Sequence, residues 1–290
     1  MPFATPQLLR PIRLLATDVD GTLLDHQHLL SPANRAALRR VAAAGIEIAL
    51  VTGRRHRYVL PIARELDVDV HLVTSNGALI RSLRDGRPGP VLFRNFLPKA
   101  DARAVLLALP EYRGQAVVTF DRENAGELVL ESPNEAQRHF SGWLENNRAA
   151  VTYRAPLQDC LDSDPVQLMF GGTIAQIELA AARLGAAPAG AAVRMLRTMY
   201  PKRDLGILDV LQRDVNKGAA VAVLARSLGI AAGEVLALGD NFNDLEMLEY
   251  AGTAVLMGNA HPEMDRPGWH RTADHNQDGV AAAVSTFLGL

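Results

Sequence analysis

The fold of this chain is decided by residues 12–24, which read Ile-Arg-Leu-Leu-Ala-Thr-Asp-Val-Asp-Gly-Thr-Leu-Leu. An apolar run of strand length ends at Asp18, and a glycine after Asp20 lets the backbone turn away. In an open α/β sheet, ligands bind at the carboxyl ends of the parallel strands, so both carboxylates should project into a crevice. Two carboxylates this close favour a shared cation, because each hinders ionisation of the other. We therefore expect a hard divalent cation, and magnesium suits such oxygen ligands.

This stretch has two other interpretations. Asp18 and Asp20 could close an ordinary turn, because Asp and Gly are common turn residues. A calcium-binding loop fails on spacing, because its sixth position would be Leu23 instead of glycine and its twelfth would be Leu29 instead of glutamate.

Length and composition limit the classes of protein. A chain of 290 residues can form one large α/β domain or two modest ones, and we expect two. The 30 Lys and Arg residues nearly balance the 32 Asp and Glu residues, so a nucleic acid partner is not expected. The single cysteine, Cys160, excludes an internal disulfide and a thiolate zinc site, and we expect it to act as a small, part-buried hydrophobic residue.

Targeting patterns are missing from the sequence. Residues 1–10 lack the basic start, apolar core and small-residue cleavage site of a secretory signal. No uncharged apolar run reaches the roughly 18 residues that a membrane span needs. We expect a cytoplasmic protein without a membrane partner, and no pattern predicts its oligomeric state.

Strands and helices alternate at both ends of the chain, and polar residues follow each strand. Ser31 and Pro32 predict the start of a helix that continues to about residue 44. Lys217 lies at the start of an expected helix over 218–228, where a cation is unfavourable unless an anion lies nearby, as a phosphate would. The other elements expected here are strands 46–51, 70–73, 235–238 and 253–257 and helices 57–66 and 244–250, followed by a tail with His261, His270 and His275.

The middle of the chain has a different pattern. A cluster of Gly and Pro within residues 85–90 predicts a domain boundary. Beyond it, strands and helices form α+β material, which we interpret as an inserted domain over 85–210 between two parts of a core, 1–84 and 211–290. The elements expected within the insertion are strands 116–120, 127–130 and 166–170 and helices 99–109, 134–147 and 174–184.

The strand ends and one helix start together indicate a single site. Each residue alone has an ordinary explanation, such as a surface turn, a helix cap or a solvated lysine. Their shared placement makes coincidence a poor explanation. The residues concerned are Asp18, Asp20, Thr52, Asn76, Lys217, Asp240 and Asp244. The late histidines lack the spacing of zinc ligands and are expected in loops, whereas His26 and His28 should lie near the crevice mouth.

The chain resembles the haloacid dehalogenase superfamily, specifically its Cof-like phosphatases with an inserted α/β cap. The resemblance implies a Rossmann-like, doubly wound parallel sheet as the core and covers nearly all of the chain outside the cap. It rests on Asp18-Val19-Asp20-Gly21-Thr22, Thr52-Gly53-Arg54, Ser75-Asn76-Gly77-Ala78, Lys217-Gly218, Gly239-Asp240-Asn241-Phe242-Asn243-Asp244 and Met257-Gly258-Asn259-Ala260. Asn216 departs from the family pattern, which often has serine there, although a helix start accepts either.

This resemblance also implies roles for individual residues. Asp18 would be the nucleophile that forms an aspartyl-phosphate, and Asp20 would be the general acid and base. The magnesium site would consist of Asp18, the backbone carbonyl of Asp20 and Asp240, with Asp244 bonded to the water ligands of the metal or to neighbouring groups. The substrate and its phosphate would be bound by Thr52, Gly53, Arg54, Asn76, Lys217 and Asn243.

The expected function is magnesium-dependent hydrolysis of a small phosphorylated metabolite, with a sugar phosphate favoured. Two alternatives are a phosphomutase, which returns the phosphoryl group to the sugar, and a non-catalytic metabolite-binding regulator on the same scaffold. The cap would select the leaving group, and little in its sequence is familiar, so the metabolite itself is not predicted.

Overall fold

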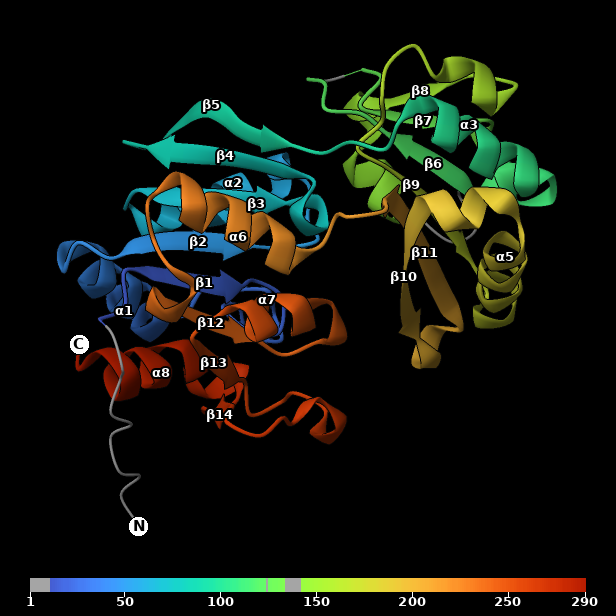
Figure 1. Ribbon diagram of the computed structural model, residues 1–290. Coiled ribbons are helices and arrows are strands. Elements are labelled where there is room, and N and C mark those ends of the chain that lie inside the picture. The colour runs from blue at the N-terminus through green and yellow to red at the C-terminus, as the bar shows by residue number, and fades with distance from the viewer. Residues whose placement is uncertain (1–10, 124, 134–141) are drawn as a thin grey trace. The chain divides into compact units, whose positions relative to one another are not determined.

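Two units make up the chain, in a computed structural model that describes residues 11–123, 125–133 and 142–290 (Figure 1). The first unit comprises Met1–Arg94 and Asn216–Leu290, and the second comprises Asn95–Val215. The second unit is therefore inserted between the two segments of the first.

The first unit contains an eight-stranded sheet with the order β14-β13-β12-β1-β2-β3-β4-β5. The six strands from β14 to β3 are parallel, and β4 and β5 add an antiparallel edge. The strands are β1 Leu14–Asp18, β2 Glu47–Val51, β3 Val70–Thr74, β4 Leu79–Arg84, β5 Arg87–Arg94, β12 Val235–Gly239, β13 Thr253–Leu256 and β14 His270–Arg271.

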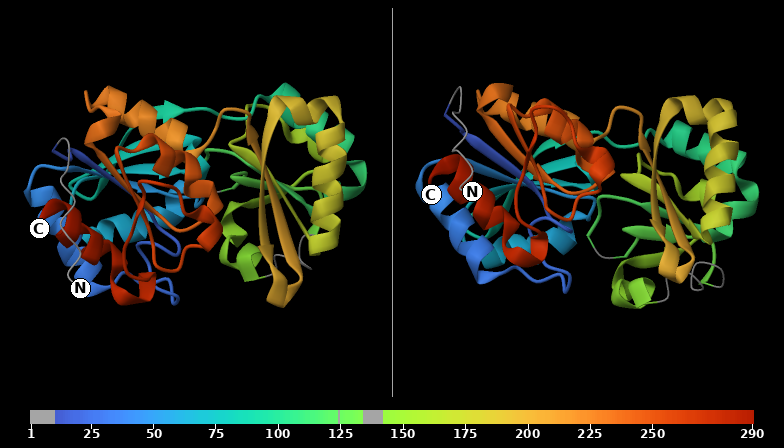
Figure 2. Two further views of the ribbon diagram at one scale, coloured as in Figure 1. Left: turned by 60° about the horizontal axis from the view of Figure 1, so that its bottom comes forward. Right: turned by 90° about the horizontal axis from the view of Figure 1, so that it is seen from below.

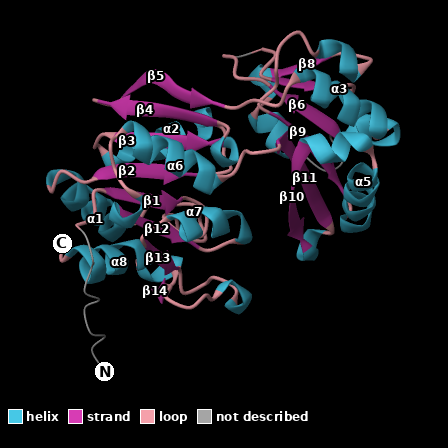
Figure 3. Cartoon of the chain, in the orientation of Figure 1, coloured by secondary structure: helices cyan, strands magenta, loops and turns pink. Residues whose placement is uncertain are grey.

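Helices cover both faces of this sheet (Figure 3). Successive strand residues point to opposite faces, so Leu15 and Leu50 pack with one group of helices and Leu14 and Val51 with the other. The first group is α1 Pro32–Ala43, α2 His56–Leu66 and α8 Gly279–Leu288, and the second is α6 Lys217–Ser227 and α7 Leu245–Tyr250. The expected doubly wound α/β fold is confirmed.

The start of α1 follows from local chemistry. The Ser31 side chain accepts a hydrogen bond from the Asn34 amide at 3.1 Å, and Pro32 occupies the first helical position. Gly45, at a φ of 75°, then turns the chain toward β2 after the helix ends.

The first boundary between the units differs from the one expected after residue 84. Asp85 and Gly86, with φ values of 49° and 70°, form a two-residue turn that joins β4 to β5. Asp-Gly favours this kind of hairpin turn. Pro88 and Pro90 are tolerated in β5 because it is an edge strand, where an amide donor is not needed on the open side. The first unit therefore continues to Arg94.

The second unit contains a six-stranded sheet with the order β10-β11-β9-β6-β7-β8. Helices α3 and α5 pack on one face of it, around Leu168 and Phe170 (Figure 2). Part of the helix expected over 134–147 lies outside the described residues. The elements are α3 Lys99–Ala108, β6 Ala116–Thr119, β7 Leu128–Leu130, β8 Val151–Tyr153, β9 Gln167–Gly172, α5 Ile174–Ala186, β10 Val193–Tyr200 and β11 Leu205–Gln212.

The second boundary and the C-terminal segment also differ from expectation. Strand β11 extends to Gln212, so the second unit ends at Val215 and not at residue 210. The expected tail contains β14 and α8. Val280, Ala283, Val284 and Phe287 follow the helical period, and all four are buried in the core of the first unit.

Two further expectations concern the membrane and Cys160. No helix within the described part of the chain combines the length and apolar character needed to cross a membrane. Cys160 is a free, buried thiol, and desolvation raises its pKa to about 11. It therefore behaves as the small hydrophobic residue that the sequence indicated.

A buried histidine lies near the amino ends of β2 and β3. His71 is 2% exposed, and its Nε2 lies 3.0 Å from the Glu47 carboxylate and 3.2 Å from the Arg84 guanidinium. Its buried Nδ1 has no hydrogen-bond partner among the described residues. Desolvation lowers the pKa of His71 below its ordinary value, and the nearby Glu47 only partly opposes this effect.

We expect His71 to make the protein sensitive to acid. Because its pKa is lower in the folded state than in the unfolded state, its contribution is retained above the unfolded pKa of about 6.5 and is lost as pH falls below it. Chemical denaturation between pH 7 and pH 5 should therefore show a smaller loss of unfolding free energy for His71→Gln than for wild type. Substituting the exposed His261 with Gln serves as the control, and equal slopes for wild type and H71Q would contradict the prediction.

A second stability prediction concerns Gly218 in α6. A Cβ atom at this position would collide with the backbone carbonyl of Glu246 in α7. Gly218→Ala should lower the free energy of unfolding by roughly 1–3 kcal/mol, although alanine favours helices over glycine by about 1 kcal/mol. Gly185 in α5 is the matched control, because its added Cβ would lie 3.7 Å from Met195, an ordinary contact. Urea denaturation in which G218A is as stable as G185A would refute this account.

Candidate functional site

Three adjacent strands bring the predicted site residues to one edge of the sheet. Strand β1 pairs in parallel with β2 on one side and with β12 on the other. Asp18 lies beside Val51 in this register, so Thr52 follows at the same edge. Asp240 follows the last residue of β12. The sheet register therefore gathers Asp18, Thr52 and Asp240, although they are far apart in sequence.

A buried lysine joins two of the carboxylates. Lys217 Nζ donates hydrogen bonds to Asp18 Oδ1 at 2.6 Å and to Asp244 Oδ1 at 2.5 Å, and Lys217 is only 1% exposed. Burial alone would lower the pKa of Lys217, but the two carboxylates hold it above its ordinary value. Lys217 is therefore charged, because it donates to two carboxylates.

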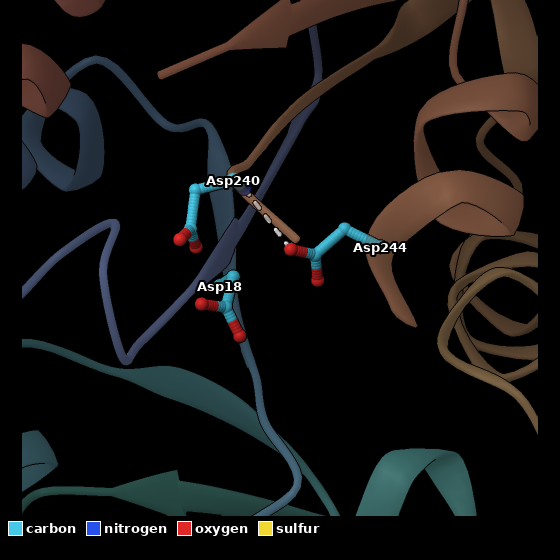
Figure 4. A group of neighbouring side chains, drawn as sticks. All are labelled: Asp18, Asp240 and Asp244. Atoms are coloured by element: carbon cyan, nitrogen blue, oxygen red, sulfur yellow. Dashed lines mark hydrogen bonds between the residues drawn. The ribbon is translucent and has the colours of Figure 1, made fainter. Parts of the chain in front are cut away.

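Asp18, Asp240 and Asp244 form an acidic cluster, with one carboxylate oxygen of each lying within 4.8 Å of the others (Figure 4). Desolvation raises the pKa of Asp18 well above its ordinary value, and Lys217 only partly opposes this while Asp244 and Asp240 add to it. Desolvation and repulsion from Asp244 raise the pKa of Asp240 to about 7. A set of oxygen donors with this excess of buried negative charge fits a hard divalent cation.

The four predicted metal ligands are not equivalent. Both Asp244 oxygens are already engaged, because Oδ1 accepts from Lys217 and Oδ2 accepts from the amides of Asp240 and Asn241, each at 3.0 Å. The Asp20 carboxylate lies outside the acidic cluster. Asp240 differs in that both of its hydrogen-bond donors, Thr22 and Asn259, are neutral side chains, whereas Asp244 accepts from the charged Lys217.

Asp20 is held by an arginine. Arg54 Nε donates to Asp20 Oδ2 at 2.7 Å and Nη2 donates to Oδ1 at 2.5 Å, so the guanidinium engages both oxygens. His28 Nδ1 lies 3.3 Å from Asp20 Oδ1. His26, also expected near the crevice mouth, instead contacts Asn276 through its amide and its ring. The sequence motifs predicted Asp20 and Arg54 for this site but not their pairing.

The residues predicted to bind phosphate are linked by hydrogen bonds. Thr52 is buried, its hydroxyl accepts from the Arg54 amide at 3.0 Å, and its carbonyl accepts from the Asn76 amide at 3.0 Å. Asn76 Oδ1 accepts from Asn243 Nδ2 at 3.3 Å. A Cβ atom on Gly53 would lie 3.1 Å from Asn76, so the lack of a side chain permits this close approach. All these residues lie in the first unit.

Two contacts to Asp240 were missed in the sequence. Thr22 donates its hydroxyl hydrogen to Asp240 Oδ1 at 3.0 Å, and Asn259 Nδ2 donates to Asp240 Oδ2 at 3.2 Å. Thr22 and Asn259 both lie in motifs quoted for the family resemblance, but neither motif alone shows that its residue contacts Asp240. The late histidines do not take part in the acidic cluster, which is the single group of potential metal ligands in the described part of the chain.

A family model of haloacid dehalogenase-like hydrolases matches residues 15–284. The chain belongs to this family. The putative phosphatase YxeH of Bacillus subtilis is 31% identical to this hydrolase over 284 residues, covering 95% of this chain and 98% of the relative. The pyridoxal phosphate phosphatase YbhA of Escherichia coli is 27% identical, covering 95% and 98%.

A solved haloacid dehalogenase-like hydrolase from Bacteroides thetaiotaomicron has the same fold, with a TM-score of 0.79 and 22% identity. The alignment covers 94% of this chain and 98% of that structure. The family match and the relatives named as phosphatases confirm the expectation of an enzyme, a phosphoric monoester hydrolase of the haloacid dehalogenase-like type.

Removing the positive charge of Lys217 should destabilise the folded protein. In Lys217→Met, Asp18 and Asp244 stay buried without their shared partner, so we expect the free energy of unfolding to fall by roughly 3 kcal/mol. Chemical denaturation in buffer with a metal chelator would measure this change. The control is Lys202→Met at an exposed position, where a change of at most about 0.5 kcal/mol is expected. Equal stabilities of the two variants would contradict the inferred role of the ion pair.

Proposed function

We propose that this hydrolase is a magnesium-dependent phosphatase that removes phosphate from a small metabolite through an aspartyl-phosphate on Asp18. The observation that carries the proposal is the buried Asp18 carboxylate, which shares Lys217 with Asp244 inside the acidic cluster. A carboxylate that is held by a cation and excluded from water is well prepared to attack phosphorus.

The proposed reaction has two steps. Lys217 engages Oδ1 of Asp18, which leaves Oδ2 to attack phosphorus while the bond to the leaving oxygen breaks. Asp20 donates a proton to that oxygen. In the second step, Asp20 takes a proton from water, the water oxygen bonds to phosphorus, and the bond to Asp18 breaks to release phosphate. Arg54 positions Asp20, and when Oδ1 of Asp20 carries the proton, Nη2 of Arg54 releases it while Nε keeps its hydrogen bond to Oδ2.

Magnesium suits the donor set of this site. We assign it to Asp18, Asp240, the backbone carbonyl of Asp20 and the surroundings of Asp244, all of which offer oxygen. A bound magnesium ion supplies positive charge that reduces repulsion between the nucleophile and the anionic substrate and stabilises the transition state.

We propose that the phosphate of the substrate is bound by the hydrogen-bonded residues around Thr52, together with Lys217. Thr52, Arg54 and Lys217 offer a hydroxyl and two cations, and Asn243 offers an amide that donates hydrogen bonds. Gly53 and Asn76 would shape the surrounding loop, because the Gly53 backbone closely approaches the Asn76 side chain.

The substrate is proposed to be a small phosphorylated metabolite, with a sugar phosphate as the favoured class. A relative named as a pyridoxal phosphate phosphatase supports a small substrate and makes pyridoxal phosphate the second compound class to test. We propose that the second unit acts as a cap that selects the leaving group.

The proposed function can be tested with p-nitrophenyl phosphate. Wild type should release phosphate in a magnesium-stimulated reaction, and Asp18→Asn should lower kcat by roughly a thousandfold or more because the amide cannot form the intermediate. Circular dichroism would verify that D18N is folded, and Asp67→Asn at an exposed helix end is the control. Wild type without magnesium-stimulated release, or a folded D18N that keeps its activity, would refute the proposal.

Product analysis on a panel of sugar phosphates and pyridoxal phosphate separates the alternatives. A phosphatase releases inorganic phosphate in step with substrate loss. A phosphomutase yields an isomeric sugar phosphate and little free phosphate, and a regulator binds its metabolite without converting it.

A further inference from the structure

Asn259 joins three loops beside the acidic cluster. Its Nδ2 donates to the backbone carbonyl of Gly21 at 2.9 Å and to Asp240 Oδ2 at 3.2 Å, and its Oδ1 accepts from the amide of His275 at 3.1 Å. The loop after β1, the loop after β12 and the segment before α8 thus meet at one side-chain amide. Asn259 belongs to the motif Met257-Gly258-Asn259-Ala260, which has no part in the reaction steps proposed for Asp18 and Asp20.

The Asp240 carboxylate is fixed from two sides. Asn259 donates to Oδ2 and Thr22 donates to Oδ1, so rotation of the carboxylate would break one bond or both. Gly21 also restricts it, because the Gly21 Cα lies so close that an added Cβ would collide with the Asp240 carboxylate. Asp240 therefore has one favoured orientation within the acidic cluster.

Asn259 is itself held in place by its surroundings. The Gly258 amide donates to the carbonyl of Ala273 at 3.0 Å, and a Cβ atom on Gly258 would lie 2.7 Å from the amide nitrogen of Asp274. The Met257 amide donates to the carbonyl of Gly239 at 3.0 Å, one residue before Asp240. The glycine thus allows the chain to pass close to its neighbour and delivers the Asn259 amide to Asp240.

We infer that Asn259 is a positioning residue for the divalent cation, and that it acts with Thr22 by orienting Asp240 as a ligand. This inference rests on the proposed cation site. Magnesium requires near-ideal ligand geometry, and groups that hydrogen-bond to its ligands commonly change affinity by 10–100-fold when removed. An asparagine suits this position because one amide donates to two oxygens and accepts from a backbone amide.

The test is magnesium binding by the metal-free full-length protein, measured by isothermal titration calorimetry. Asn259→Ala should weaken magnesium binding about tenfold, because Asp240 loses the donor on Oδ2. Asn259→Asp should weaken it further, because its carboxylate faces Gly21 and Asp240 oxygens and repels them. If magnesium affinity depended only on the charge near the site, the added negative charge of N259D would instead strengthen magnesium binding.

Two sets of controls separate orientation from general loss of structure. Asn276→Asp adds the same charge in the neighbouring segment, where Asn276 contacts His26 and Asp274 and not Asp240, so magnesium affinity should stay within about twofold of wild type. Thr22→Val should weaken binding as N259A does, and Thr22→Ser should restore it because the hydroxyl is retained. Thermal unfolding without metal would verify that each variant is folded at the titration temperature.

The outcomes distinguish this inference from the proposed function. If wild type binds magnesium and hydrolyses p-nitrophenyl phosphate, but folded N259A and N259D bind magnesium as wild type does, the inference is overturned and the phosphatase proposal stands. Tighter binding by N259D also overturns it. Wild type that binds no magnesium overturns both. Weakened binding in the order N259A and then N259D, with N276D near wild type, supports the inference.

Discussion

The ion pair of Lys217 with Asp18 and Asp244 is the interaction on which the rest of the site depends. A lone buried lysine would lose its proton, and two lone buried carboxylates would gain one. Together they make two short charge-assisted contacts, 2.6 Å from Lys217 to Asp18 and 2.5 Å from Lys217 to Asp244, which offset part of the cost of burying all three groups. The three residues come from the end of β1, the start of α6 and the loop after β12, so the pair also fixes these elements at one edge of the sheet.

Four aspartates surround this edge, and their partners differ. Asp18 is held by Lys217, Asp20 by the fork of Arg54, Asp240 by Thr22 and Asn259, and Asp244 by Lys217 and two backbone amides. The four roles proposed for these aspartates, as nucleophile, proton carrier, metal ligand and loop support, rest on one chemical group in four different hydrogen-bond environments.

The sequence predicts this edge of the sheet well because strand ends are local features. An apolar run followed by Asp18, or a serine before Pro32, needs no knowledge of distant contacts. The pairing of Arg54 with Asp20 and of Asn259 with Asp240 depends on how separate loops meet, so the motifs show the participants without their partners. The Asp85-Gly86 turn is different, because the local pattern was visible but the neighbouring prolines made it resemble a domain boundary.

The insertion of the second unit has a consequence for synthesis. Asp18 and Lys217 are 199 positions apart, and the whole second unit is made between them. At translation rates of about 5–20 residues per second, on the order of 10–40 seconds pass between the synthesis of Asp18 and the synthesis of Lys217. During that interval Asp18 lacks the lysine that offsets the cost of burying its carboxylate. The ribosome therefore completes the contiguous second unit before the discontinuous first unit can close around its own charged centre.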